Sequence, residues 1–164
     1  MISKKMLDAL NNHLNEEFYS SYLYLSMAAY FEDKNLNGFA NWFKLQAQEE
    51  WAHGMKFYDF INQTGGKVIL KAIGAPKTNW KSITDVFKET LAHEKHITGL
   101  INKLAGQAIQ AKDYATNNFL QWFVTEQVEE EATAEEILNK VKLIGDNTGG
   151  LFMLDRELGF RKAQ

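Results

Sequence analysis

Residues that break helices are gathered at a few places in this chain, and the stretches between them are long. The single proline is Pro76, and Gly65-Gly66 and Gly145 each follow a stretch in which apolar residues recur at steps of three and four. Because glycine and proline end helices, and because that spacing places side chains on one helix face, we predict five helices. We expect them at residues 4–32, 37–63, 83–111, 114–144 and 148–160.

The connection between the second and third of these helices is unusually long. At about 3.3 Å per extended residue, its roughly eighteen residues reach about 60 Å, which exceeds the length of about 42 Å of a 28-residue helix. It can therefore cross the whole molecule, whereas the two other turns are short and form antiparallel hairpins. The sequence predicts a single all-α domain over residues 1–164, a four-helix bundle with one long crossover and a short C-terminal fifth helix.

Charge balance and the lack of cysteine exclude several kinds of function. With 18 Lys and Arg against 21 Asp and Glu, the chain lacks the basic clusters that bind phosphates, and no nucleic acid partner is expected. No apolar run reaches the roughly 18 residues of a membrane span, and the first residues lack the apolar block of a signal peptide, so we expect a cytoplasmic protein with no membrane partner. Because there is no cysteine, any metal must be bound by carboxylate, imidazole or amide groups.

Polar residues interrupt the apolar seam of each of the four long helices. Each seam contains a glutamate where a leucine is expected, and the second helix adds a histidine three residues later, on the same face. These inward polar positions are Glu17, Glu50, His53, Glu94, Gln127 and Glu130. Burying one unpaired carboxylate is costly, and four together would repel one another strongly. Such a layer is stable only with cations.

The four glutamates are also expected at one depth in the bundle. An antiparallel hairpin brings two residues level when they are equidistant from its turn. The midpoint of Glu17 and Glu50 falls in the first turn, and the midpoint of Glu94 and Glu130 is Lys112, in the second. A solvated face would explain any single glutamate, but not this coincidence. The pattern predicts two metal ions a few ångströms apart, and iron or manganese suits these ligands best.

At these positions the chain resembles the ferritins, in particular the haem-free bacterial and archaeal group. The resemblance covers the whole chain and is closest at residues 19–24, 48–50 and 119–131. Ferritin-like di-iron proteins can carry a second Glu-x-x-His motif on the fourth helix. Here Gln127-x-x-Glu130 replaces that motif, as in the haem-free ferritins.

The resemblance implies an iron storage protein with ferroxidase activity, which oxidises Fe(II) to Fe(III) with O2 or peroxide. Its ferric mineral would be held inside a homo-oligomeric cage of 24 subunits, with the apolar fifth segment lining the fourfold axes. One iron would be bound by Glu17, Glu50 and His53. The second would be bound by Glu50, Glu94 and Glu130, with Glu50 bridging the two.

The resemblance also implies a third iron position and two further side chains at the centre. The third position would be formed by Glu49, Glu126 and Glu129, although a solvated face explains these three residues equally well. Gln127 is expected beside the iron pair. Tyr24, one heptad beyond Glu17, is expected to donate an electron or a hydrogen bond, although a tyrosine in a core is ordinary.

Other functions fit the sequence less well. Di-iron enzymes of the rubrerythrin or oxygenase kind normally carry the second Glu-x-x-His, mini-ferritins lack the fifth helix, and a metal-free structural bundle leaves the level carboxylates unexplained. Bacterioferritins bind haem through a methionine at the position of Ala52, so no haem is expected. His13, His93 and His96 have no partner at comparable spacing, and we expect them at the surface or in packing roles.

Overall fold

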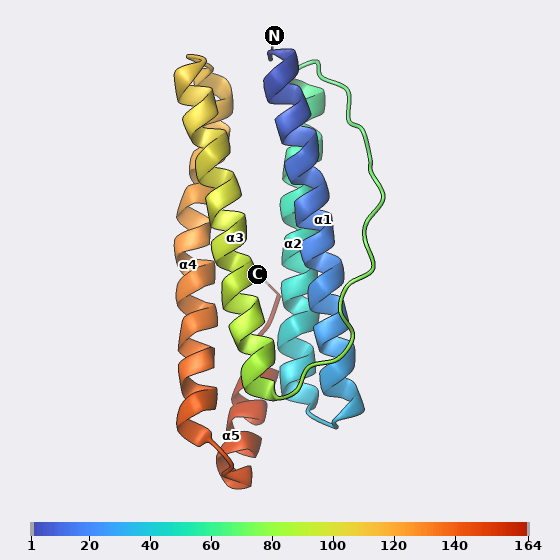
Figure 1. Ribbon diagram of the computed structural model, residues 1–164, viewed down its shortest axis with the longest axis vertical. Helices are drawn as coiled ribbons and strands as arrows, with labels where there is room; N and C mark the ends of the chain where they lie inside the picture. The colour runs from blue at the N-terminus through green and yellow to red at the C-terminus, as the bar shows by residue number, and fades with distance from the viewer. Residues whose placement is uncertain (1, 164) are drawn as a thin grey trace.

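The computed structural model describes residues 2–163 and consists of helices joined by turns and one long connection (Figure 1). The helices are α1 (Lys4–Asp33), α2 (Asn37–Gln63), α3 (Ile83–Gln110), α4 (Tyr114–Ile144) and α5 (Thr148–Gly159). Each begins and ends within one residue of the expected position. Over the described range there is no strand, and the predicted all-α bundle with a long crossover is confirmed.

Two antiparallel hairpins, α1–α2 and α3–α4, lie side by side and are linked by the long connection. That connection runs along the outside of the first hairpin from one end of the bundle to the other (Figure 1). Side chains of α1 hold it in place. The buried Asn11 donates to the carbonyl of Lys67 at 3.1 Å and accepts from the amide of Ile69 at 2.7 Å, and Ser26 donates to the carbonyl of Lys77 at 2.7 Å. The crossover is therefore an ordered part of the fold.

The apolar core is divided into two clusters, one at each end of the bundle. The cluster at the α5 end is rich in stacked rings, with Phe31 lying 4.9 Å from Phe39 and 5.5 Å from Phe43 between ring centroids. The other cluster is built around Leu14 and Phe57. The layer between the two clusters contains the inward polar residues. None of the helices within residues 2–163 is long and apolar enough to cross a membrane.

Helix α5 closes one end of the bundle and packs mainly against α2. The N-cap position of α2, Leu36, provides no capping side chain. Instead, Asp155 of α5 accepts a hydrogen bond from the amide of Phe39 at 3.0 Å, which satisfies a free donor in the first turn of α2. Gly38 makes this approach possible, because a Cβ atom there would lie 1.6 Å from the carbonyl oxygen of Asp155.

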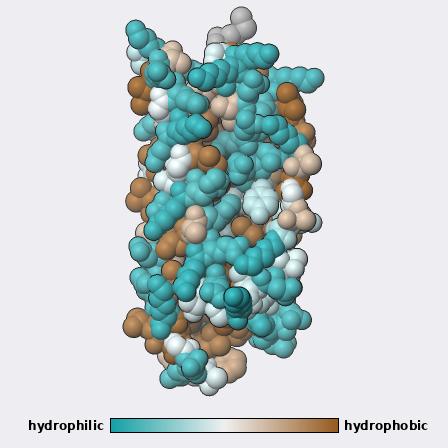
Figure 2. All heavy atoms as spheres, in the orientation of Figure 1, coloured by the Kyte–Doolittle hydropathy of each residue, from teal (hydrophilic) through white to brown (hydrophobic). Residues whose placement is uncertain are grey.

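Exposed apolar side chains lie on the outer side of α5 and on its C-cap residue, Phe160. Leu154 and Leu158 are buried against the bundle, whereas Phe152, Met153 and Phe160 are 64%, 75% and 69% exposed. Figure 2 shows apolar residues gathered at this end of the molecule. Exposed apolar side chains that gather on one surface are typical of a contact with another protein, so this end of the subunit is suited to such a contact.

Candidate metal centre

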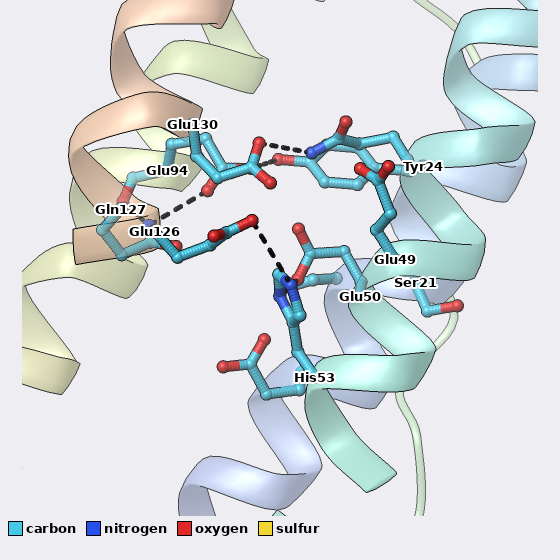
Figure 3. A network of polar contacts seen from close by, with 12 residues as sticks. Ser21, Tyr24, Glu49, Glu50, His53, Glu94, Glu126, Gln127 and Glu130 are labelled. Carbon is cyan, nitrogen blue, oxygen red and sulfur yellow. Dashed lines mark hydrogen bonds and ion pairs between the residues drawn. The ribbon is translucent and has the colours of Figure 1, made fainter. Parts of the chain in front are cut away.

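The four inward glutamates lie together in the layer between the two apolar clusters, one from each long helix. Glu17, Glu50 and Glu94 are 1–2% exposed, Glu130 is 8% exposed, and His53 is 5% exposed. Figure 3 shows Glu50 and His53 on one side of the site facing Glu94 and Glu130 on the other. The register argument from the two hairpins thus gave the correct depth for all four carboxylates.

Two overlapping sets of possible ligand atoms lie within the layer. In the first set, one atom each of Glu17, Glu50 and His53 lie within 4.8 Å of one another, and in the second the same holds for Glu50, Glu94 and Glu130. Glu50 belongs to both sets. These are the two ligand groups that the resemblance implies, and their binding of iron remains a prediction. The donor atoms are the oxygens and imidazole nitrogens that iron accepts.

Without a cation, burial favours the protonated forms of three of the clustered carboxylates, Glu50, Glu94 and Glu130. Burial, and then the charges of Glu94 and Glu17, raise the pKa of Glu50 well above its usual range. Burial raises the pKa of Glu94 to about 7, against the lowering effect of hydrogen bonds from Tyr24 and Gln127. Burial and the charge of Glu94 likewise raise the pKa of Glu130 to about 8. A cation in this layer would replace those protons.

Neighbouring side chains orient the carboxylates on the α3–α4 side. The hydroxyl of Tyr24 donates to Oε1 of Glu94, and burial together with the charge of Glu94 raises the pKa of Tyr24, so the phenol remains a donor. Nε2 of Gln127 donates to Oε2 of Glu94 at 3.2 Å. Nε2 of Gln46 donates to Oε2 of Glu130 at 2.6 Å. The expected placement of Tyr24 and Gln127 beside the centre agrees with these contacts, but a catalytic role for either remains a prediction.

His13 contributes to the site, and the expectation that it lacks a partner was wrong. It is only 3% exposed, and its Nε2 lies 2.7 Å from Oε1 of Glu17. Although burial alone would raise the pKa of Glu17, the charge and hydrogen bond of His13 hold it below the usual value. Oε2 of Glu17 is buried with no hydrogen-bond partner in the described residues. An orphaned buried carboxylate oxygen fits a cation ligand.

The other two histidines lie on the α1–α3 side. His93 is in hydrogen-bond contact with Oγ of Ser20 at 2.7 Å, and burial, followed by the charge of His96, lowers its pKa to about 4. The side chain of His96 is 57% exposed and lies 3.8 Å from a carboxylate oxygen of Glu16. The expected roles are therefore confirmed for both, since His93 is packed and has Ser20 as an additional hydrogen-bond partner, and His96 lies at the surface.

The three residues of the implied third iron position are not assembled into one ligand set. Glu126 approaches Nε2 of His53 at 4.0 Å and forms a set of possible ligands with His53 and Glu130. Glu129 is exposed, and Glu49 is paired with Arg161. Among residues 2–163, no set of three ligand atoms within 4.8 Å includes either Glu49 or Glu129.

Metal affinity should increase with pH. Raised pKa values mean that Glu94 and Glu130 carry protons below about 7 and about 8, which a metal ion must displace. Calorimetric titration with Zn²⁺, a redox-inert substitute for Fe²⁺, should therefore show tighter binding as the pH rises through this range. The number of protons released per bound Zn²⁺ should decrease above about pH 8. Glu130→Gln should flatten the upper part of the profile. A wild-type affinity independent of pH would contradict these protonation states.

Removing the partner of Glu17 should weaken metal binding. His13→Leu should reduce Zn²⁺ affinity by roughly 10–100-fold, because a group that orients a metal ligand contributes about that much. His13→Gln should retain most of the affinity, since its amide can still donate to Oε1 of Glu17. His96→Leu, the same change at an exposed position, is the control. Equal affinity in His13→Leu and wild type would show that His13 only fills space.

A buried layer of four carboxylates and one histidine, carried by two antiparallel helix hairpins, defines a helical bundle protein with a carboxylate-rich candidate metal site. Residues 7–144 match the family described as the ferritin-like domain. The chain belongs to the ferritin family. It is an iron storage protein with ferroxidase activity.

Relatives and solved structures agree with this assignment over nearly the full length. The chain is 44% identical to a bacterial non-heme ferritin of Staphylococcus aureus (strain MRSA252) over 161 residues, which cover 98% of this chain and 97% of the relative. It is 45% identical, with the same coverage, to one from Staphylococcus haemolyticus. An open pore ferritin from the hyperthermophilic archaeon Archaeoglobus fulgidus superimposes with a TM-score of 0.98 at 49% identity, covering 99% of both chains.

Proposed function

We propose that the buried layer binds two Fe(II) ions per chain and is where this protein oxidises them. The observation that carries this proposal is the pair of overlapping ligand sets that share Glu50, in a layer where one oxygen of Glu17 has no other partner. Glu17, Glu50 and His53 would hold one ion. Glu50, Glu94 and Glu130 would hold the other, which gives both ions a common ligand.

The chemistry of the ligands favours oxidation of the bound substrate. Hard carboxylate oxygens stabilise Fe(III) relative to Fe(II), so the ions lose electrons readily, and two ions side by side supply the two electrons that O2 accepts in forming peroxide. Tyr24 and Gln127 hold the carboxylate of Glu94, and Gln46 holds that of Glu130, which limits rearrangement while the charge on the metal changes. The apolar clusters at the two ends of the bundle bury the layer between them.

We also propose a third iron position at the outer edge of the layer. Glu126 lies beside His53, and Glu49 and Glu129 are its implied companions. Ions leaving the central pair would pass through this edge on their way to the mineral. Tyr24 is proposed to orient the carboxylate of Glu94 through its hydrogen bond. Donation of an electron from its phenol to the iron centre is a second proposed role.

Storage requires a closed container, and we propose that the chain forms a homo-oligomeric cage of 24 subunits. The exposed apolar side chains of Phe152 and Met153 on α5, and of Phe160 directly after it, support an assembly contact at this end of the subunit. The structural relative engineered as a closed form of the Archaeoglobus fulgidus ferritin, at TM-score 0.99 and 48% identity, is similar over 100% of both chains. A cytoplasmic location remains a prediction from the sequence.

Oxidation and storage can be tested together. The apo protein is loaded with Fe²⁺ without oxygen, air is admitted, and ferric absorbance is followed while light scattering gives the particle mass. The proposal expects fast oxidation of about two Fe²⁺ per chain, followed by retention of many more in a large particle. Fast oxidation by a small oligomer that releases its iron would instead indicate a di-iron enzyme.

A further inference from the structure

Tyr24 is sealed inside the bundle, although one of its proposed roles is to give up an electron. Its side chain is 0% exposed, and its hydroxyl donates to Oε1 of Glu94 (Figure 3). Once the phenol has lost an electron to the iron centre, a reductant dissolved in water cannot touch the oxidised ring. The electron that restores Tyr24 from outside must therefore pass through a neighbouring side chain.

Two aromatic rings pack against Tyr24 in the part of the chain that the structure describes, and only one of them leads outward. The ring of Phe43 lies 5.9 Å from that of Tyr24, but it is itself 0% exposed and has no group that a tyrosyl radical oxidises. The imidazole of His93 lies 5.8 Å from the phenol and perpendicular to it, at 88°. The same imidazole lies 6.1 Å from the ring of Tyr19, which is only half-buried.

We propose that Tyr19 is the residue through which this protein re-reduces Tyr24, with the imidazole of His93 as the bridge between the two phenols. This inference rests on the proposed donation of an electron by Tyr24. It assigns to the α1–α3 side of the bundle a path by which oxidising equivalents leave the metal centre for the surface. The external electron donor is a small water-soluble reductant of the ascorbate class.

Ser20 fixes the bridging ring. Its hydroxyl has a single proton, which it donates to the backbone carbonyl of Glu16 at 3.0 Å. The same oxygen lies 2.7 Å from Nε2 of His93, so it accepts a hydrogen bond from that nitrogen. Ser20 is 0% exposed, and water does not compete for this contact. The hydrogen bond sets the tautomer of the imidazole and holds the ring in contact with both phenols.

Each electron transfer along this path is accompanied by a proton transfer. When Tyr24 loses an electron, its phenolic proton moves along the hydrogen bond to Glu94. Tyr19 then passes one electron across the imidazole to the Tyr24 radical, and Glu94 returns the proton to the oxygen of Tyr24. Tyr19 loses its own phenolic proton to water and becomes the radical. An ascorbate anion gives this radical one electron and one proton, which restores the phenol and leaves an ascorbyl radical in solution.

The positions of the two tyrosines suit such an exchange. They lie five residues apart on α1, which corresponds to about 7.5 Å along the helix axis. Both are phenols, so the transfer between them is close to balanced in free energy, and reduction of Tyr19 by the external donor drives it toward restored Tyr24. Tyr22 is more exposed than Tyr19, at 49%, but it is not among the rings that pack against His93.

The test is the lifetime of the tyrosyl radical in the assembled protein. The iron-free protein is mixed with about two Fe²⁺ per chain in air and then with ascorbate, and samples frozen at successive times are measured by electron paramagnetic resonance. Tyr19→Phe, which keeps the ring but removes the oxidisable phenol, should lose the signal at least about 10-fold more slowly than wild type. Tyr22→Phe, the same change on the same helix, is the matched control and should behave as wild type does.

Two further variants complete the measurement. Tyr24→Phe should give no tyrosyl signal, which assigns the radical. Ser20→Ala leaves both tyrosines in place but frees the imidazole, and it should also slow the loss of the signal. Equal rates of loss in Tyr19→Phe and Tyr22→Phe would overturn the proposal. Failure of the proposed function has a different signature, because wild type would then show no tyrosyl radical at all, and electron donation by Tyr24 would itself be refuted.

Discussion

Glu50→Ala is expected to abolish rapid Fe(II) oxidation, with the initial rate falling by at least about 100-fold. Glu50 is the only residue common to the two inner ligand sets, so its loss removes a ligand from both ions at once. Without the shared ligand, the two iron ions are no longer held at a fixed distance from each other. Transfer of two electrons to one O2 molecule requires that fixed distance. Stopped-flow measurement of ferric absorbance after mixing with Fe²⁺ gives the rate directly.

Loss of activity in this variant should not reflect loss of the fold. Burial and the charges of Glu94 and Glu17 make an ionised Glu50 unfavourable in the metal-free protein, so its removal also removes the free-energy cost of burying and protonating this carboxyl group, which offsets the cost of the cavity left behind. The melting temperature of the apo variant should therefore stay close to that of wild type. Glu135→Ala, at an exposed glutamate of α4, is the control. A wild-type oxidation rate in Glu50→Ala would refute the assignment of the centre.

Gly38→Val is expected to convert the large particle into small species. A Cβ at Gly38 would lie 1.6 Å from the carbonyl oxygen of Asp155, so the backbone of α5 must withdraw by about 1.8 Å (3.4 − 1.6) to reach ordinary contact. That movement breaks the hydrogen bond between Asp155 and the amide of Phe39 and displaces the exposed apolar side chains of α5. Light scattering and size-exclusion chromatography measure the particle mass.

The control for this change is a glycine in open space. Gly99→Val introduces the same side chain into α3, where a Cβ would meet nothing within 4 Å, and should leave the particle intact. Both variants should retain the circular dichroism of a helical bundle, since neither side chain enters the core between the four long helices. If the Gly38→Val protein formed particles of the wild-type mass, the contact between α5 and the first turn of α2 would not be needed for assembly.

The bundle and the central glutamates were predictable because both depend on local periodicity. A glutamate at a seam position must point inward whatever surrounds it, and the distance of Glu17 and Glu50 from their turn sets their depth without knowledge of the partner hairpin. The sequence therefore contained the arrangement of the central carboxylates. His13 was missed although the signal was present, since it lies four residues before Glu17 and thus on the same face.

The contacts of the C-terminal segment were not predictable in this way. Arg161 pairs with Glu49 across 112 residues, and it does so only because α5 folds back onto α2. No periodicity in either segment specifies that return. The sequence around Gly38 likewise indicates only an ordinary helix residue, because its requirement for glycine comes from the close approach of Asp155 in the tertiary structure. Contacts that the C-terminal part of the chain makes with the four long helices therefore cannot be predicted from periodicity.

The most direct test of the account is a crystal structure of the protein soaked anaerobically with Fe²⁺, with data collected at the iron absorption edge. The anomalous map should show two peaks inside each subunit, one between Glu17, Glu50 and His53 and one between Glu50, Glu94 and Glu130. Glu50 should contact both. An empty central layer, with iron bound only at the outer carboxylates Glu126 and Glu129, would contradict it.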